Sequence, residues 1–124
     1  MSTTTEIQTV PKVGDILVSA WGYDQTNIDF YKVVKATEKS VWLQPIKQQI
    51  VQQTGSLSET VVPLDTAATD YAWNESGERV DITLGSARYK IHISKNSGNY
   101  FVRLNSFSRA HLWNGKPMEQ THYH

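Results

Sequence analysis

Residues 88–105, RYKIHISKNSGNYFVRLN, decide the fold class of this 124-residue chain. The first six residues alternate between charged or polar and aromatic or aliphatic side chains, which is the period of a half-buried β-strand. A turn-forming sequence follows at residues 96–99, and the alternation resumes at residues 100–105. This pattern predicts an antiparallel hairpin in which successive side chains face opposite sides of a sheet.

Segments nearer the N-terminus extend the same pattern. Residues 16–18, 28–36 and 41–46 are rich in β-branched and aromatic residues. A polar loop at residues 21–27 and a tight polar turn at residues 37–40 separate them, so they predict a three-stranded meander. We therefore expect an all-β domain, a small SH3-like or Tudor-like barrel or sandwich with an additional C-terminal hairpin. This likeness of shape carries no function by itself.

Three parts of the chain have less regular patterns. Residues 54–77 are turn-rich, and only residues 60–63 resemble a short strand. Residues 106–113 are expected to form a loop or one short helix. Pro45 cannot donate to a β-ladder, so we expect it at a bulge or an edge.

Length and composition restrict the organisation and the partners. The length fits one β domain at residues 12–124, preceded by a flexible tail at residues 1–11. Lys plus Arg and Asp plus Glu both total 12, which argues against a protein dedicated to duplex nucleic acid. The absence of cysteine excludes disulfides, thiolate zinc sites and thiol nucleophiles. No apolar run has membrane-spanning length and no signal peptide is evident, so we expect a cytoplasmic protein.

The segment at residues 21–27 combines stacking faces with hydrogen-bond donors and acceptors, as sites for planar polar ligands do. In the alternative interpretation, the two aromatic side chains fill the core, and the Asp and Asn side chains bond to their own backbone. The candidate ligand-binding residues in this segment are Trp21, Tyr23, Asp24, Gln25 and Asn27.

A second candidate cluster lies near residues 100–109. Alternation places Phe101, Arg103 and Asn105 on one face, with Arg109 close by. Arg beside an aromatic ring suits a phosphate or a base, through forked hydrogen bonds and stacking. The neighbouring strand adds polar positions that would make this face locally basic; the alternative is a solvated face on which Arg and Phe only pack. These neighbouring residues are Arg88, Lys90 and His92.

No constellation typical of an enzyme is evident, and we expect neither catalysis nor a cofactor. The sequence has no Ser-His-Asp order and no phosphate-cradling glycine loop. His122 and His124 have metal-ligand spacing but lack a third ligand, so we expect no metal site. Trp113 precedes the turn NGKP, and we expect it to anchor the C-terminal segment on the barrel or to contact a neighbouring subunit of a homo-oligomer.

Three segments of the sequence resemble a known protein family. They are WGYDQTNIDFYKVV at residues 21–34, KSVWLQPI at residues 39–46 and WNGKPMEQTHYH at residues 113–124. They resemble a family of small proteins encoded by phages and prophages of Gram-positive bacteria, with an early WGYDQTN motif and a late W(D/N)GKP motif. The resemblance covers roughly residues 13–124. It implies a phage accessory protein, of the kind used against host defences, and supplies no biochemical activity.

Together these observations favour a non-enzymatic phage binding protein that acts in counter-defence by sequestering a small polar, nucleotide-like ligand. One alternative is an inhibitor that binds a host protein directly through an aromatic surface. A further alternative is a module for single-stranded nucleic acid, against which the zero net charge counts.

Overall fold

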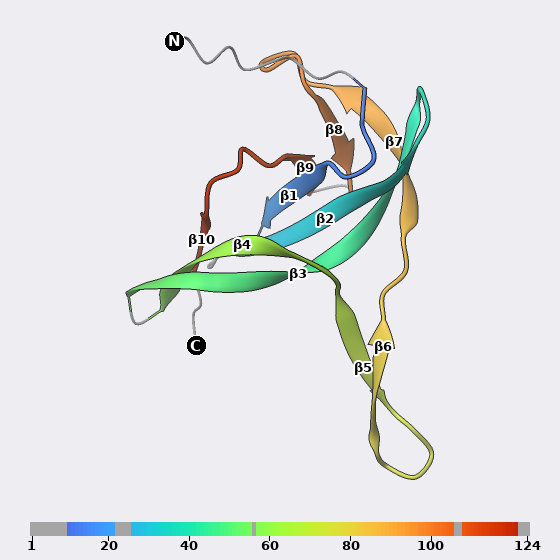
Figure 1. The fold of residues 1–124 in the computed structure, drawn as a ribbon, viewed down its shortest axis with the longest axis vertical. Helices are drawn as coiled ribbons and strands as arrows, with labels where there is room; N and C mark the ends of the chain where they lie inside the picture. The colour runs from blue at the N-terminus through green and yellow to red at the C-terminus, as the bar shows by residue number, and fades with distance from the viewer. Residues whose placement is uncertain (1–9, 22–25, 56, 106–107, 122–124) are drawn as a thin grey trace.

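The computed structural model describes residues 10–21, 26–55, 57–105 and 108–121. Within these residues the chain forms ten antiparallel β-strands and no helix (Figure 1). No helix that could cross a membrane occurs in this part of the chain. The strands are β1 (Ile16–Trp21), β2 (Asn27–Ala36), β3 (Ser40–Gly55), β4 (Ser58–Ala67), β5 (Thr69–Trp73), β6 (Arg79–Thr83), β7 (Ala87–Ile93), β8 (Tyr100–Arg103), β9 (Arg109–Leu112) and β10 (Met118–Thr121).

Eight of the described strands form one sheet, in the order β10-β4-β3-β2-β1-β9-β8-β7. The first part of β3 also pairs with β7, with Val41 opposite Tyr89, so the pairings return to their starting strand. We call the strands β3, β2, β1, β9, β8 and β7 the strand ring. The second part of β3 pairs instead with β4, which carries β10 along its other edge. The long strand β3 therefore belongs to both parts of the sheet.

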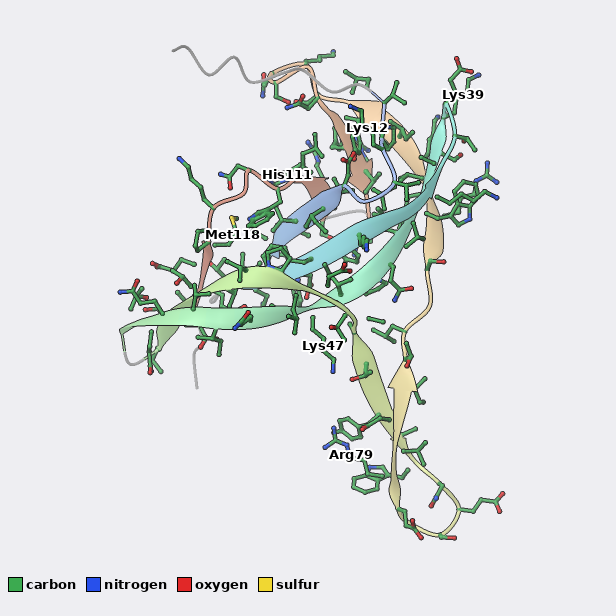
Figure 2. All side chains as sticks on the ribbon, viewed as in Figure 1. Lys12, Lys39, Lys47, Arg79, His111 and Met118 are labelled. Atoms are coloured by element: carbon green, nitrogen blue, oxygen red, sulfur yellow. The ribbon has the colours of Figure 1, made fainter. Side chains whose placement is uncertain are left out.

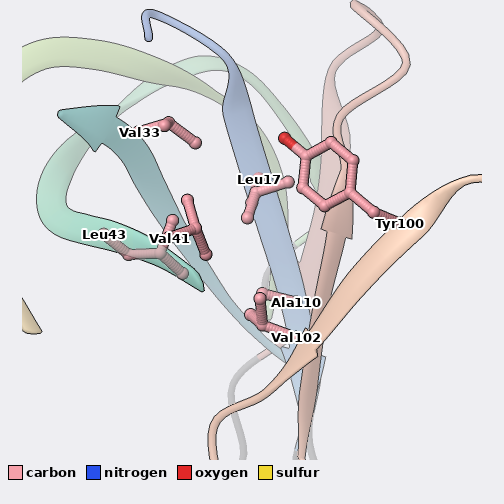
Figure 3. Close-up of a cluster of buried hydrophobic side chains, with 7 residues drawn as sticks. All are labelled: Leu17, Val33, Val41, Leu43, Tyr100, Val102 and Ala110. Atoms are coloured by element: carbon pink, nitrogen blue, oxygen red, sulfur yellow. The ribbon is translucent and has the colours of Figure 1, made fainter. Parts of the chain in front are cut away.

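The main hydrophobic core lies inside the strand ring (Figure 3). Every strand of the ring contributes inward side chains, because alternate residues of each strand face the same way. The hydroxyl of the buried Tyr100 donates to Asp15 Oδ2 at 2.9 Å, which ties this core to the turn before β1. The buried members of the core are Leu17, Val33, Val41, Leu43, Tyr100, Val102 and Ala110.

A second core covers the opposite face of β1 and β2. Phe30 is 2% exposed and meets the Trp113 ring edge to face, with 6.0 Å between ring centroids. Trp113 Nε1 donates to the Lys116 carbonyl at 2.7 Å, so the Trp113 indole also holds the NGKP turn in place. The expectation that Trp113 fixes the C-terminal segment is confirmed. Val18, Ile28, Ile46 and Val61 complete this core.

The structure confirms the all-β class and the hairpin at residues 88–105, in which β7 pairs with β8. Gly98 adopts a positive φ of 76° in the connecting turn, a conformation that glycine reaches without strain. This hairpin is part of the strand ring and not an addition to it. The separate hairpin is instead β5–β6, which projects from the body of the protein (Figure 1).

Two local expectations were wrong. Most of residues 54–77 is regular: β4 includes the short strand expected at 60–63, and β5 follows it. Residues 109–112 form β9 and no helix, because this segment fills the gap between β1 and β8 in the ring.

The expectation for Pro45 holds. It pairs with Tyr31 on one side, whereas on its other side the β7 ladder has ended and the β4 ladder has not begun. The predicted tail at residues 1–11 lies outside the described residues except for Val10 and Pro11.

Candidate functional site

The candidate residues that the structure describes fall into two groups. Trp21 ends β1 opposite Asn27 at the start of β2, and Trp21 is 45% exposed, which places its ring outside the core. Phe101 and Arg103 lie on β8, and Arg109 lies opposite Arg103 on β9. Tyr23, Asp24 and Gln25 lie outside the described residues.

These two groups do not converge on one ligand. Phe101 and Arg103 alternate with the buried Tyr100 and Val102, so they point away from the ring interior. Trp21 lies on the same side of β1 as the buried Leu17, and therefore borders the interior at one end of the ring. Asn105, the second residue after β8, lines a cavity with Trp21.

The outward side chains of β7, β8 and β9 form a surface that we call the outer face. Two cross-strand rows are fixed by the register: His92, Phe101 and His111 stand opposite one another, and Arg103 stands opposite Arg109. One row is aromatic and the next is cationic. The outer face consists of Lys90, His92, Phe101, Arg103, Arg109 and His111.

Phe101 is the centre of the outer face. Its ring stacks on His92, with centroids 5.4 Å apart and an interplanar angle of 26°. The Arg109 guanidinium lies 5.3 Å from the centroid of the same ring. A cavity of about 440 Å³ on the Arg103 side of the ring and one of about 270 Å³ towards His111 share Phe101 and Arg109 as walls.

The electrostatic field of the outer face is positive. Burial lowers the pKa of His92, and Arg103, Lys90 and Arg109 lower it further, which favours the neutral imidazole. The ion pairs found in the described residues are Lys32–Asp65 and Arg79–Asp81, and neither includes an outer-face cation. A chain with no net charge thus gathers unpaired positive charge beside a stacked aromatic pair.

Arg88, grouped with Lys90 and His92 by sequence, lies elsewhere. Its Nη2 donates to Ser40 Oγ at 3.1 Å, and its guanidinium lies 5.7 Å from the centroid of the Trp42 ring. Arg88 therefore stabilises the junction of β3 and β7 and adds nothing to the outer face.

A further cavity of about 430 Å³ lies at one end of the ring interior, and we call it the end cavity. Asp29 and Tyr31 from β2 line it beside Trp21, and Trp21 Nε1 donates to Asp29 Oδ2 at 2.5 Å. Sequence reasoning missed this cavity because its tyrosines occupy inward positions that alternation assigns to the core. The remaining lining residues are Tyr89, Leu104, Asn105 and Ser108.

Ser19 lies on the same inward face, between Leu17 in the core and Trp21 at the end cavity. It is fully buried, and its Oγ has no hydrogen-bond partner in the described part of the chain. Because an unsatisfied buried hydroxyl costs free energy, Ser19→Ala should stabilise the free protein by about 1 kcal/mol in urea denaturation. A Ser19→Ala variant that is less stable than the parent would contradict this, and Ser86→Ala serves as an exposed-hydroxyl control.

Tyr31 makes the fold sensitive to alkaline pH. Burial, followed by the charges of Asp29 and Tyr89, raises its pKa from 10.0 to about 12. A pKa raised in the folded state gives stability that is present below pH 10 and is lost as the pH rises towards 12. The urea midpoint should fall across this interval, and less steeply in Tyr31→Phe. An equally steep fall in the variant would show that Tyr31 is not responsible.

No group of His, Cys, Asp or Glu among the described residues has the arrangement of a metal site. The histidine pair His122 and His124 lies outside them. Comparison of the chain with protein-family models, with curated proteins and with solved structures yields no match. The chemistry of the described surfaces is therefore the basis for any functional assignment.

Proposed function

We propose that this protein is a non-enzymatic binding protein for a small phosphate-bearing, nucleotide-like ligand, and that the outer face is its binding surface. The observation that carries the proposal is the pair of opposed arginines, Arg103 and Arg109, beside the stacked rings of His92 and Phe101. Neither arginine is in an ion pair within the described residues.

Each half of a nucleotide has a counterpart on this surface. The planar base stacks on the neutral His92 or on Phe101, since stacking on an aromatic side chain contributes about 1–3 kcal/mol per base. The phosphates accept forked hydrogen bonds from Arg103 and Arg109. The cavity of about 440 Å³ is within the range of small-molecule sites, roughly 300–1,000 Å³.

The setting of this activity is part of the proposal. The resemblance to phage and prophage proteins supports a counter-defence role in the host cytoplasm, where a sequestered nucleotide signal no longer reaches its receptor. The strand pairings run from β3 through β2, β1, β9, β8 and β7 and back to β3. This supports assigning the strand ring to the small SH3-like or Tudor-like barrels. An outward face beside the hairpin of β7 and β8 is then the ligand-binding side of that barrel.

The test is a calorimetric titration with a panel of mononucleotides, cyclic dinucleotides, inorganic tripolyphosphate and nucleosides. We expect a nucleotide to bind more tightly than either its nucleoside or tripolyphosphate alone, because base and phosphate contact different rows. Thermal stability should rise with ligand concentration. Absence of binding by every nucleotide at low salt would overturn the proposal.

A second titration, with oligonucleotides, distinguishes a protein that binds free nucleotides from one that binds single-stranded nucleic acid. Binding of oligothymidylate that strengthens with length and weakens steeply with salt would favour the nucleic-acid module. A single nucleotide that binds as tightly as the oligomer would exclude it.

A second candidate function, direct binding of a host protein, has its own observation. The projecting β5–β6 hairpin exposes 66% of Trp73 and 52% of Tyr71, together with Val80 and Ile82. Aromatic residues of this kind form hot spots in protein interfaces. Capture of one host protein from lysate by the parent, and its loss in Trp73→Ala, would support this function over nucleotide binding.

A further inference from the structure

We infer that the end cavity is a second ligand site, and that it takes an alkylated ammonium cation such as a trimethylammonium group. This site is distinct from the outer face in place and in charge. Its lining, as far as the structure describes it, contains one carboxylate, that of Asp29, and no Lys, Arg or His.

Aromatic rings line the cavity on several sides. Trp21 comes from β1, Tyr31 from β2 and Tyr89 from β7, so three strands of the ring each contribute one. Within the described residues none of these rings makes a ring–ring contact with another, and the cavity lies between them. Aromatic faces attract a cation through the ring quadrupole, most strongly where the cation loses water.

Asp29 supplies the charge that a cation requires. It makes no ion pair within the described chain, so its carboxylate is not neutralised by a neighbouring side chain. The Trp21 indole donates to Asp29 Oδ2, which orients the carboxylate and holds the indole ring at the cavity wall. A carboxylate beside aromatic faces favours a positive ligand over a neutral one of the same shape.

The hydroxyl groups nearby fit a ligand with a polar end. Ser19 stands directly opposite Asp29 in the β1–β2 ladder, so the two side chains lie on the same face. Ser19 is fully buried and is not among the residues that line the cavity, so the hydroxyl-bearing residues of the lining are Tyr31, Tyr89 and Ser108. Burial raises the pKa of the Tyr31 phenol to about 12, so this phenol remains a neutral donor at physiological pH.

The ligand cannot be the anion proposed for the outer face. The unpaired cations of that face point away from the ring interior, whereas Asp29 and Tyr31 line the cavity at its end. An anion in the end cavity would face the Asp29 carboxylate, and the described lining residues include no cation to compensate. The two sites therefore select opposite charges, and failure of one proposal leaves the other standing.

The test compares choline with its neutral carbon isostere, 3,3-dimethylbutan-1-ol, in calorimetry and in an NMR titration that follows the Trp21 indole N–H. We expect choline to bind at least about tenfold more tightly than the isostere, and to shift the Trp21 resonance. Equal affinity for the two probes, or a shift of other indoles only, would overturn the inference.

Asp29→Asn keeps the shape of the side chain and an oxygen that accepts from Trp21, but removes the charge. Choline affinity should fall about tenfold in Asp29→Asn while the weak affinity for the isostere is unchanged. Asp70→Asn, on the projecting hairpin, is the matched control and should bind choline as the parent does. Undiminished choline binding by a folded Asp29→Asn variant would refute the site.

The trimethylammonium group could belong to a free small molecule or to a modified side chain of a partner protein. A titration with a short peptide that contains trimethyllysine distinguishes these two sources. Peptide binding tighter than choline binding assigns the cavity to a modified side chain of a partner. Choline binding tighter than peptide binding assigns it to a free small molecule. If neither probe binds, the inference is wrong, whatever the nucleotide titration of the outer face gives.

Discussion

Replacement of Phe30 by alanine should destabilise the fold by roughly 3–5 kcal/mol, the cost typical of removing a large aromatic side chain from a core. Phe30 is 2% exposed and lies in the second core, which joins β1 and β2 to β4. Its edge-to-face contact with Trp113 also holds the segment between β9 and β10. Since small domains have a total stability of about 5–15 kcal/mol, this loss should be visible as a large drop in the urea midpoint.

The control for Phe30→Ala is Tyr71→Ala on the projecting hairpin. Tyr71 is 52% exposed, and its ring contacts within the described residues are with Trp73 and Arg79, so its loss should change global stability by no more than about 0.5 kcal/mol. Equal effects of the two substitutions would show that the second core does not support the ring. The contrast is therefore a test of the fold itself, independent of any ligand.

The fold class was predictable because alternation is a local property. In residues 88–105 each inward residue is followed by an outward one, and the turn at residues 96–99 leaves a single way to pair the two strands. The position of Pro45 and the anchoring by Trp113 were also predictable, because a missing N–H and a large aromatic ring limit their surroundings.

Closure of the ring was not predictable, because it depends on pairs far apart in sequence. Leu17 stands opposite Leu112, and Ser40 stands opposite Lys90. Alternation shows which face of a strand is apolar but carries no information about which strand lies beside it. The second half of β3 was missed for a different reason: residues 51–55 are exposed on both faces, and their pairing with β4 rests on backbone hydrogen bonds.

The outer face was partly predictable from the sequence, whereas the end cavity was not. Alternation placed Phe101 and Arg103 together on one face, and the register of β7 and β9 then brought His92 and Arg109 beside them. The end cavity was missed because Tyr31 occupies an inward position like that of a core residue. Whether such a tyrosine packs in the core or lines an opening depends on where the strand ring ends.

Loss of both outer-face arginines should reduce nucleotide affinity by roughly a hundredfold or more, because hydrogen bonds to charged groups contribute about 1.5–3 kcal/mol each. Arg103 and Arg109 stand opposite one another, so one phosphate chain reaches both. We expect Arg103→Ala/Arg109→Ala to bind nucleoside as the parent does, since the His92–Phe101 stack is retained. Calorimetry of the parent, the single variants and the double variant measures the coupling between the two side chains.

Arg79→Ala is the matched control for this experiment. Arg79 lies on the projecting hairpin, well away from His111 of the outer face (Figure 2), and its guanidinium contacts Asp81 and the Tyr71 ring. If attraction by net charge alone explained nucleotide binding, Arg79→Ala would weaken it as much as one outer-face substitution. If the outer face is the site, affinity in Arg79→Ala stays at the parental value while both outer-face variants lose it. A double variant that keeps parental nucleotide affinity would move the site elsewhere and leave the stacked row without a ligand.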